Sequence, residues 1–390
     1  MCNISSNKEC FGCGVCAISC PRKLISIGLN ENGFYAPRIQ SESSCNGCGI
    51  CASVCAYLDK NQIITTSIRA SYAAYNKNQL IRKAASSGGA AYAIADSLIK
   101  QGHKICAVRY NTEKHRTEHY IANTQDELVA SLGSKYVQSY TIDGLNAILR
   151  DGKYVVIGTP CMIASVRKLI ELKRISDRFI LLDFFCHGVP SKLLWDKYIR
   201  KHEQTLGKIS NVSWRDKDHG WHNSYNMKIH GENGMYVKSL AQGDIFYRLF
   251  LGDYCLNEVC YSHCKFKKFN SAADIRIGDL WGQTYATNNE GYSGLIVYTK
   301  KGEEVVNNNE NLVLHKKSGH IVSEGQLSTS PSKPYASRLI LHALKKEHNG
   351  WWRERLIISI SEAYQKLKKL VCSPRLVLKN RLRCFKIRQK

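Results

Sequence analysis

The sequence has no stretch approaching about 18 consecutive apolar residues, so no segment is predicted to cross a membrane as a helix. Its first residues lack a basic stretch followed by an apolar one, and we therefore expect no export signal. Neither a G-x-G-x-x-G sequence nor a P-loop occurs, which argues against Rossmann-type and Walker-type nucleotide sites. Acidic residues are also scarce, with 32 Asp and Glu against 56 Lys and Arg. We expect a basic, cytoplasmic protein of two or three domains.

The positive charge is concentrated toward the C-terminus. Residues 331–390 hold 16 Lys and Arg against 3 Asp and Glu. Residues 351–371 have helical periodicity, and one side of this helix would carry Leu356, Ile360, Ala363, Leu367 and Leu370. A basic amphipathic segment with tryptophans suits the surface of an anionic membrane, and a packing helix with a solvated tail fits equally well. No nucleic-acid binding is expected, since no recognised motif accompanies the charge.

Cysteine is abundant: the chain has 17, and eight of them form two matching runs. Each run has the spacing C-x2-C-x2-C-x3-C, that of bacterial ferredoxins with cubane iron–sulfur clusters. The last cysteine of each run ligates the other cluster in two-cluster ferredoxins. We therefore predict one [4Fe-4S] site at Cys10, Cys13, Cys16 and Cys55, and a second at Cys45, Cys48, Cys51 and Cys20. Zinc sites use cysteine pairs separated by longer loops, and disulfide frameworks belong to short secreted chains, so the two runs argue against both alternatives.

After a connector at residues 59–70, short apolar runs alternate with helical periodicity, which predicts a mixed α/β or α+β domain. The clearest unit is βαβ, with strands at 153–158 and 178–185 around a helix at 161–173. Such apolar parallel strands are buried on both faces, and both end at the sheet edge where ligands bind. The other predicted strands are 71–75, 103–110, 119–123, 209–214, 225–230 and 294–299, and the other helices are 90–100, 128–132, 191–202 and 242–251.

Two cysteines lie just beyond the strands of this βαβ unit. Cys161 follows the first strand and Cys186 the second, so the sheet should bring them together. The C-x3-C pair Cys260 and Cys264 would complete four thiolates for a third cubane cluster, with Cys255 as a competing ligand. The alternative is that these cysteines are small buried hydrophobic residues.

Two segments could bind the phosphates of a cofactor. Ser86-Ser87-Gly88-Gly89 opens a helix, where free backbone N–H groups and the helix dipole favour anions. Ser134-Lys135-Tyr136 offers hydroxyl groups and a cation. Taken alone, such segments are more often a plain helix cap or loop. An iron–sulfur protein that acts on organic molecules, however, usually needs a two-electron converter, and flavin is the common one.

These motifs occur in an order that resembles the family of coenzyme F-420 hydrogenase/dehydrogenase beta subunits. The resemblance covers about residues 70–320 and runs over residues 86–89, 133–139, 158–161, 186–188, 260 with 264, and 273–282. It implies an iron–sulfur flavoprotein that binds FAD near Ser86–Gly89 and Ser134–Tyr136 and exchanges hydride with a deazaflavin. It also implies the third cluster. Ferredoxin-fused bacterial members, some linked to surface-polysaccharide synthesis, are closest in layout.

Four regions are expected: a two-cluster ferredoxin domain (1–58), two parts of a flavoprotein domain (70–145 and 150–320), and the basic region 331–390. The expected protein is an oxidoreductase that passes electrons between a redox partner or other external donor or acceptor, its clusters and FAD, with hydride exchange to a deazaflavin-like or other organic molecule. A non-catalytic electron-transfer subunit and a reductase of polysaccharide synthesis are the alternatives. No catalytic residue is assigned, since Asp279 and Trp281 fit a strand-end turn slightly better than a redox site. Peripheral contact with the inner membrane face is left open.

Overall fold

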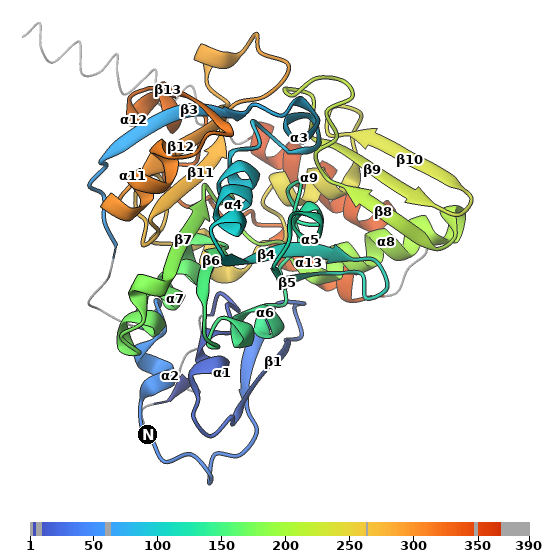
Figure 1. Ribbon diagram of the computed structural model, residues 1–390. Helices are drawn as coiled ribbons and strands as arrows, with labels where there is room; N and C mark the ends of the chain where they lie inside the picture. The colour runs from blue at the N-terminus through green and yellow to red at the C-terminus, as the bar shows by residue number, and fades with distance from the viewer. Residues whose placement is uncertain (1–2, 5–9, 59–63, 263, 347–349, 368–390) are drawn as a thin grey trace, which may run out of the picture.

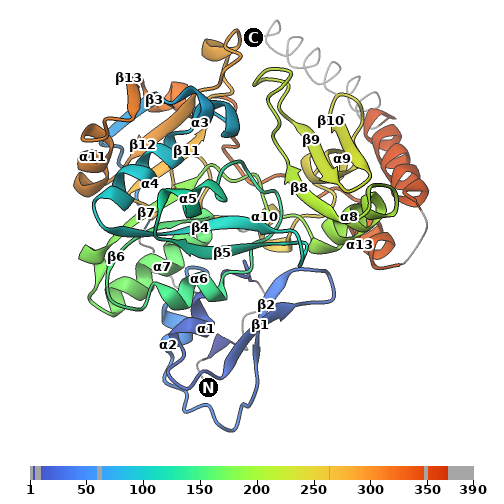
Figure 2. The ribbon, with the colours of Figure 1, turned by 45° about the vertical axis from the view of Figure 1, so that its right-hand side comes forward.

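A computed structural model describes residues 3–4, 10–58, 64–262, 264–346 and 350–367. A small N-terminal unit lies below a larger body (Figure 1), and within that body a three-stranded sheet stands beside an eight-stranded one (Figure 2). The expected fold class, a ferredoxin-like unit followed by a mixed α/β domain with a parallel βαβ unit, is confirmed. Among the helices of the described residues, none has the length and apolar character needed to span a bilayer.

The N-terminal unit is built from two short helices and a hairpin. Strands β1 (Ile25–Leu29) and β2 (Tyr35–Ile39) pair antiparallel, while helices α1 (Val15–Ser19) and α2 (Ile50–Ser53) each begin inside a cysteine run. The N-cap of each helix is a glycine with a positive φ, 76° at Gly14 and 75° at Gly49. Only glycine adopts this conformation without strain, so each cysteine loop can turn directly into its helix.

The eight-stranded sheet has a parallel centre and antiparallel edges. Its order is β13-β3-β12-β11-β7-β6-β4-β5. The parallel strands are β4 (His103–Asn111), β6 (Lys153–Ile157), β7 (Phe179–Phe184) and β11 (Ile275–Asp279). The antiparallel strands are β3 (Ala70–Asn76), β5 (Arg116–Ala122), β12 (Ser293–Val297) and β13 (Leu312–Lys316). The parallel strands β6, β7 and β11 therefore end at one shared edge, as the sequence predicts for the first two.

Two helices cover opposite faces of this sheet. Helix α4 (Ala90–Lys100) packs on one face and α7 (Pro160–Leu172) on the other. Val155 and Ile180 point into the core beside α4, whereas Val156 and Leu181 point into the core beside α7. Burial on both faces explains why β6 and β7 are continuously apolar in the sequence.

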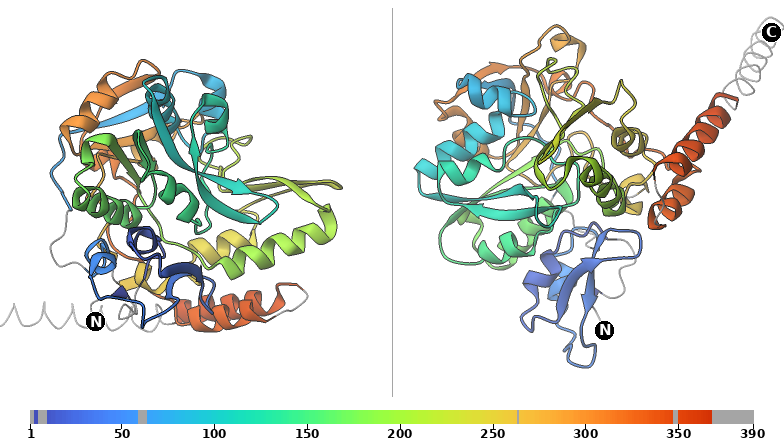
Figure 3. Two further views of the ribbon diagram at one scale, coloured as in Figure 1. Left: turned by 60° about the horizontal axis from the view of Figure 1, so that its bottom comes forward. Right: turned by 90° about the vertical axis from the view of Figure 1, so that its right-hand side faces the viewer.

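The N-terminal unit is docked on the α7 side of the body. Val15 and Val54 are fully buried in the same core cluster as α7. Gln138 donates to the Phe11 carbonyl at 3.0 Å and accepts from the Tyr35 N–H at 2.8 Å, so one buried amide binds two segments of the unit's backbone. The first cysteine run therefore lies at the interface. Figure 3 (left) shows the unit from below, in front of the body.

The three-stranded sheet forms a second layer with its own helices. Strands β8 (Ile209–Ser213), β9 (Asn226–Gly231) and β10 (Gly234–Ser239) are antiparallel. They share an aromatic core, including Trp195, Trp214 and Phe246, with helices α8 (Lys192–Leu206), α9 (Ile245–Leu251), α10 (Glu258–Ser262) and α13 (Ser337–Lys345). The remaining helices are α3 (Gln79–Ala84), α5 (Gln125–Val129), α6 (Ile142–Ala147), α11 (Lys300–Asn307) and α12 (Gly319–Val322).

Several predicted boundaries are wrong, and capping explains two of them. Helix α9 begins at Ile245 rather than at residue 242, because the Asp244 carboxylate accepts from two N–H groups of the first turn. Helix α5 begins at Gln125 rather than at residue 128, because the Thr124 hydroxyl caps it. Strand β5 starts three residues earlier than predicted, where Glu118 pairs with Arg109 of β4 at 2.9 Å. Strands β1, β2, β10, β11 and β13 were not predicted.

Candidate redox site

The first predicted cluster site is a small cavity between four sulfurs, here called the inner set: Cys10, Cys13, Cys16 and Cys55. Burial raises the pKa of Cys10 to about 11 and that of Cys13 to about 12, and the neighbouring thiols raise both further. Four buried thiols become thiolates readily only when cations compensate their charge, which is what the irons of a cluster do. The donor set fits a [4Fe-4S] cluster.

The second predicted site is another small cavity, lined by the outer set: Cys20, Cys45, Cys48 and Cys51. Asn3 also lines it, and its side-chain amide donates to Cys45 Sγ at 3.8 Å. Each cavity is thus lined by three cysteines of one run and the last cysteine of the other. Within the described residues, no three His, Cys, Asp or Glu side chains converge on a point suited to a single metal ion. A cubane does not require such a point, because each thiolate binds a different iron.

The third set, Cys161, Cys186, Cys260 and Cys264, lies at the carboxyl edge of the large sheet. Burial raises the pKa of Cys161 well above its usual range, and the charges of Cys186, Cys13 and Cys264 add to this effect. Burial likewise raises the pKa of Cys186 to about 11 and that of Cys260 to about 12, with Cys264 contributing to both. Cys186 and Cys264 are therefore neighbours of both Cys161 and Cys260, and Cys13 of the inner set lies near Cys161.

Cys255, the competing ligand, has the surroundings of a core side chain. Its thiol donates to the Leu249 carbonyl at 3.9 Å, and burial raises its pKa to about 12. His187 lies next to Cys186 in sequence, but its Nε2 faces the Asp253 carboxylate at 2.8 Å. His263, between the third-set cysteines of the C-x3-C pair, lies outside the described residues.

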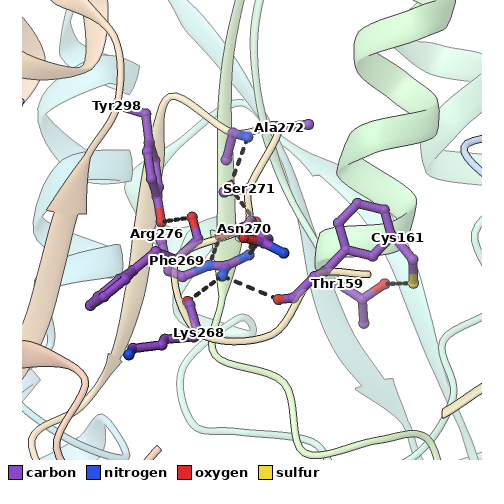
Figure 4. A network of polar contacts seen from close by, with 12 residues as sticks. Thr159, Cys161, Lys268, Phe269, Asn270, Ser271, Ala272, Arg276 and Tyr298 are labelled. Atoms are coloured by element: carbon purple, nitrogen blue, oxygen red, sulfur yellow. Dashed lines mark hydrogen bonds and ion pairs between the residues drawn. The ribbon is translucent and has the colours of Figure 1, made fainter. Parts of the chain in front are cut away.

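A buried arginine holds the loop that follows Cys264. Arg276 binds the Asp183 carboxylate through Nε at 2.7 Å and Nη2 at 2.6 Å, and neither side chain is exposed. Its remaining N–H groups donate to the carbonyls of Phe266, Lys268 and Asn270 (Figure 4). Lys267, on the same loop, donates to the Cys186 carbonyl at 2.6 Å. The loop is thereby fixed against the third set.

A cavity of about 630 Å³ opens beside the inner set and the third set. Its wall includes Cys13 of the inner set and Cys186 of the third set. Six of the seven residues predicted to contact a cofactor also line it: Ser86, Ser87, Gly89, Ser134, Lys135 and Tyr136. The volume lies within the range of ligand and cofactor pockets.

Gly88 is the predicted residue that does not line the cavity. A Cβ on Gly88 would lie 2.4 Å from the Ala74 carbonyl oxygen, and the Gly88 carbonyl accepts from the Asn76 N–H at 2.8 Å. Its role is therefore close approach to strand β3. The two predicted segments do meet, since the Ser134 N–H donates to Ser86 Oγ at 2.6 Å.

Lys135 lies in the cavity wall and is partly buried. Its Nζ donates to the carbonyls of Ser131, Leu132 and Gly133 at 2.8–3.1 Å. Burial lowers its pKa to about 7. The side chain thus orders the loop after α5 and offers a titratable cation at the cavity, where the sequence predicts one.

An arginine–aromatic wall was missed by the sequence reasoning. Arg215 has no exposed side-chain surface and lies 4.6 Å from the ring centres of both Tyr225 and Trp281. It donates to the Tyr136 hydroxyl at 3.1 Å and to Asp279 Oδ2 at 3.0 Å. Because Tyr136, Tyr225 and Trp281 all line the cavity, Arg215 fixes a flat aromatic surface there.

One signal could have revealed this wall. Strand β11 is parallel to β7 and ends at Asp279, so the rule that placed Cys186 at the ligand-binding edge also applies to Asp279. Predicting β11 would therefore have brought Asp279 and Trp281 to the cavity. The strand-end turn that the sequence favours is present, and it forms part of the wall.

Comparison with known families covers most of the chain. A model for the N-terminal part of the coenzyme F420 hydrogenase/dehydrogenase beta chain matches residues 71–146, and the model for the C-terminal part of the same beta chain matches residues 151–318. A 4Fe-4S dicluster domain matches residues 9–58. A comparison with curated proteins gave no match.

Among solved structures, one similar chain belongs to the F420-reducing [NiFe] hydrogenase complex of Methanosarcina barkeri, in a xenon derivative. The two chains are 16% identical, the alignment covers 78% of this chain and 93% of that one, and the TM-score is 0.46. The two family models together span more than half of the sequence. This protein therefore belongs to the coenzyme F420 hydrogenase/dehydrogenase beta-subunit family and carries a 4Fe-4S dicluster domain ahead of it.

Proposed function

We propose that this protein is an iron–sulfur flavoprotein oxidoreductase with three [4Fe-4S] clusters and one FAD. The observation that supports it best is the cavity of about 630 Å³, whose wall includes Cys13, Cys186 and the two predicted phosphate-binding segments. A cofactor in this cavity would contact the surroundings of two clusters at once. An FAD bound there would supply the exchange between single electrons and hydride.

The chain offers distinct groups to the two ends of such a cofactor. The first turn of α4, together with Ser86 and Ser87, suits a pyrophosphate. The wall fixed by Arg215 offers a flat face to an aromatic ring, and Tyr136 and Tyr225 form part of that face.

The three cysteine sets suggest a route for electron transfer. The outer set contains the exposed Cys48, where a redox partner protein or another external donor or acceptor could approach. The inner set lies at the interface with the body, and the third set lies beside it and beside the cavity. We infer that electrons travel between the outer set and the cavity in this order or its reverse.

The hydride partner is proposed to be a deazaflavin-like molecule or another organic acceptor or donor. Reduction of a saccharide or of its lipid carrier in surface-polysaccharide synthesis is the second candidate, since the basic region 331–390 would suit work at the inner face of a membrane from the cytoplasm. An electron-transfer subunit without chemistry of its own is the third.

Anaerobic purification followed by iron, sulfide and flavin quantitation tests the proposal. We expect about twelve irons and one FAD per chain. Arg215→Met should lower the bound flavin at least about tenfold while the iron content stays the same, because Asp279 loses its buried partner and the wall loses its order. Arg69→Met, which removes an exposed ion pair with Glu303, is the matched control. Wild-type protein with about eight irons and no flavin would leave only the electron-transfer subunit.

A further inference from the structure

An apolar stripe faces outward on the helix of residues 352–367. Its members are Trp352, Leu356, Ile360, Tyr364 and Leu367, and each side chain is 52–61% exposed. Their spacings of four, four, four and three residues place them on one face, within about 120° of the helix circumference. Single exposed apolar residues are ordinary, but a continuous row marks an interaction surface.

The opposite face of the helix already holds it on the protein. Ile358 is fully buried in the aromatic core around α8, and Glu354, equally buried, accepts from Lys197 Nζ at 2.6 Å. Trp351 packs near Tyr198 at a ring distance of 6.3 Å. Because this face is packed, the stripe is not required for the core; the helix itself lies at the edge of the body (Figure 3, right).

A neighbouring segment extends the stripe. Tyr335, just before α13, is 72% exposed, and its ring meets that of Tyr364 edge-on at 5.9 Å. The surface therefore joins two parts of the chain and carries aromatic residues at both ends. Tryptophan and tyrosine beside aliphatic residues are typical of the boundary between lipid headgroups and acyl chains.

The charges around the stripe are arranged to favour an anionic surface. Both acidic residues of the helix point to cations on the body, Glu354 to Lys197 and Glu362 to Arg248 at 3.0 Å. Arg355 and Lys366 are exposed on the side of the helix that borders the stripe. In sequence, residues 368–390 add further Lys and Arg and no acidic residue.

We propose that this stripe docks on an anionic lipid surface, which gives the membrane contact of the proposed function a defined site. Leu356, Ile360 and Leu367 enter the acyl boundary, and the basic border contacts lipid phosphates. A second copy of this chain is a poorer occupant, because pairing two such faces would oppose two basic borders.

Vesicle sedimentation of the anaerobically purified holoprotein tests the docking surface. We expect pelleting with vesicles of phosphatidylcholine and phosphatidylglycerol, little pelleting with phosphatidylcholine alone, and release by high salt. The triple variant Leu356→Ser/Ile360→Ser/Leu367→Ser should lower the partition coefficient at least about tenfold. The control triple Leu80→Ser/Val129→Ser/Leu172→Ser changes side chains that are also 50–79% exposed, on other faces, and should pellet like wild type.

Iron content distinguishes a failure of the docking proposal from a failure of the redox proposal. The wild type, the stripe variant and the control variant should contain equal amounts of iron, whether or not they bind lipid. Equal pelleting of the stripe variant and wild type overturns the docking surface. So does equal pelleting with neutral vesicles, or a wild-type dimer in solution that the stripe variant converts to monomer, which would assign the stripe to a second copy.

Discussion

The inner and outer cysteine sets share one spacing but lie in contrasting surroundings. The inner set is enclosed by the body, where Phe11 meets Phe266 edge-on at 6.2 Å and Thr141 donates to the Cys13 carbonyl at 2.9 Å. The outer set lies at the far end of the unit and includes an exposed cysteine. Ligand spacing therefore predicts the kind of cluster, whereas docking decides which cysteine set is enclosed and which stays at the surface.

The largest expected effect comes from removing one proposed cluster ligand of the third set. Cys161→Ser should remove about four of about twelve irons and leave both N-terminal clusters, because three remaining thiolates hold a cubane poorly. Iron quantitation and electron paramagnetic resonance of the reduced protein measure this. Cys255→Ser is the matched control, since its buried thiol faces the Leu249 carbonyl. Full iron content in Cys161→Ser would contradict the third cluster.

The second-largest expected effect is a difference in the rate of iron loss between the two N-terminal clusters, because solvent reaches them unequally. Under mild oxidation with a chelator present, the irons of the outer set should leave at least about tenfold faster than those of the inner set, because a buried site must open before reagent reaches it. Time courses of iron release, with Cys48→Ser to identify the fast phase, measure the difference. A single release rate for both clusters would show that docking does not protect the inner set.

Much of this contrast could be predicted from the sequence, and its limits are physical. The cysteine runs specified both sets because ligation depends on local spacing. Likewise Val155 and Ile180 lie in strands whose apolar runs revealed the βαβ unit. The docking could not be predicted, since Gln138 and Phe11 are far apart in sequence and the motifs that contain them carry no signal for a contact between them. Arg215 was missed for the same reason: its partners come from four separate segments.

Weakening the interface between the N-terminal unit and the body should make the inner set lose iron more nearly as fast as the outer set. Gln138→Leu leaves the Phe11 carbonyl and the Tyr35 N–H without their partner, at a cost of about 2 kcal/mol. We expect lower stability and faster iron release from the inner set alone. Gln101→Leu, at the exposed end of α4, is the control. Denaturant titration and iron-release kinetics provide the two measurements, and unchanged inner-set kinetics would place the protection elsewhere.

The smallest effect concerns a buried histidine behind the interface. His119 is within hydrogen-bond distance of Ser139 Oγ at 2.8 Å and the Ile157 carbonyl at 3.2 Å, and burial lowers its pKa from 6.5 to about 4. Between these values the unfolded chain binds more protons than the folded one, so stability falls as the pH falls. From about pH 7 to about pH 5.5 the expected loss is about 1 kcal/mol. Denaturant titrations at several pH values should show this loss of unfolding free energy in the wild type and not in His119→Gln. Equal pH dependence in the two proteins would show that His119 does not make the fold acid-sensitive.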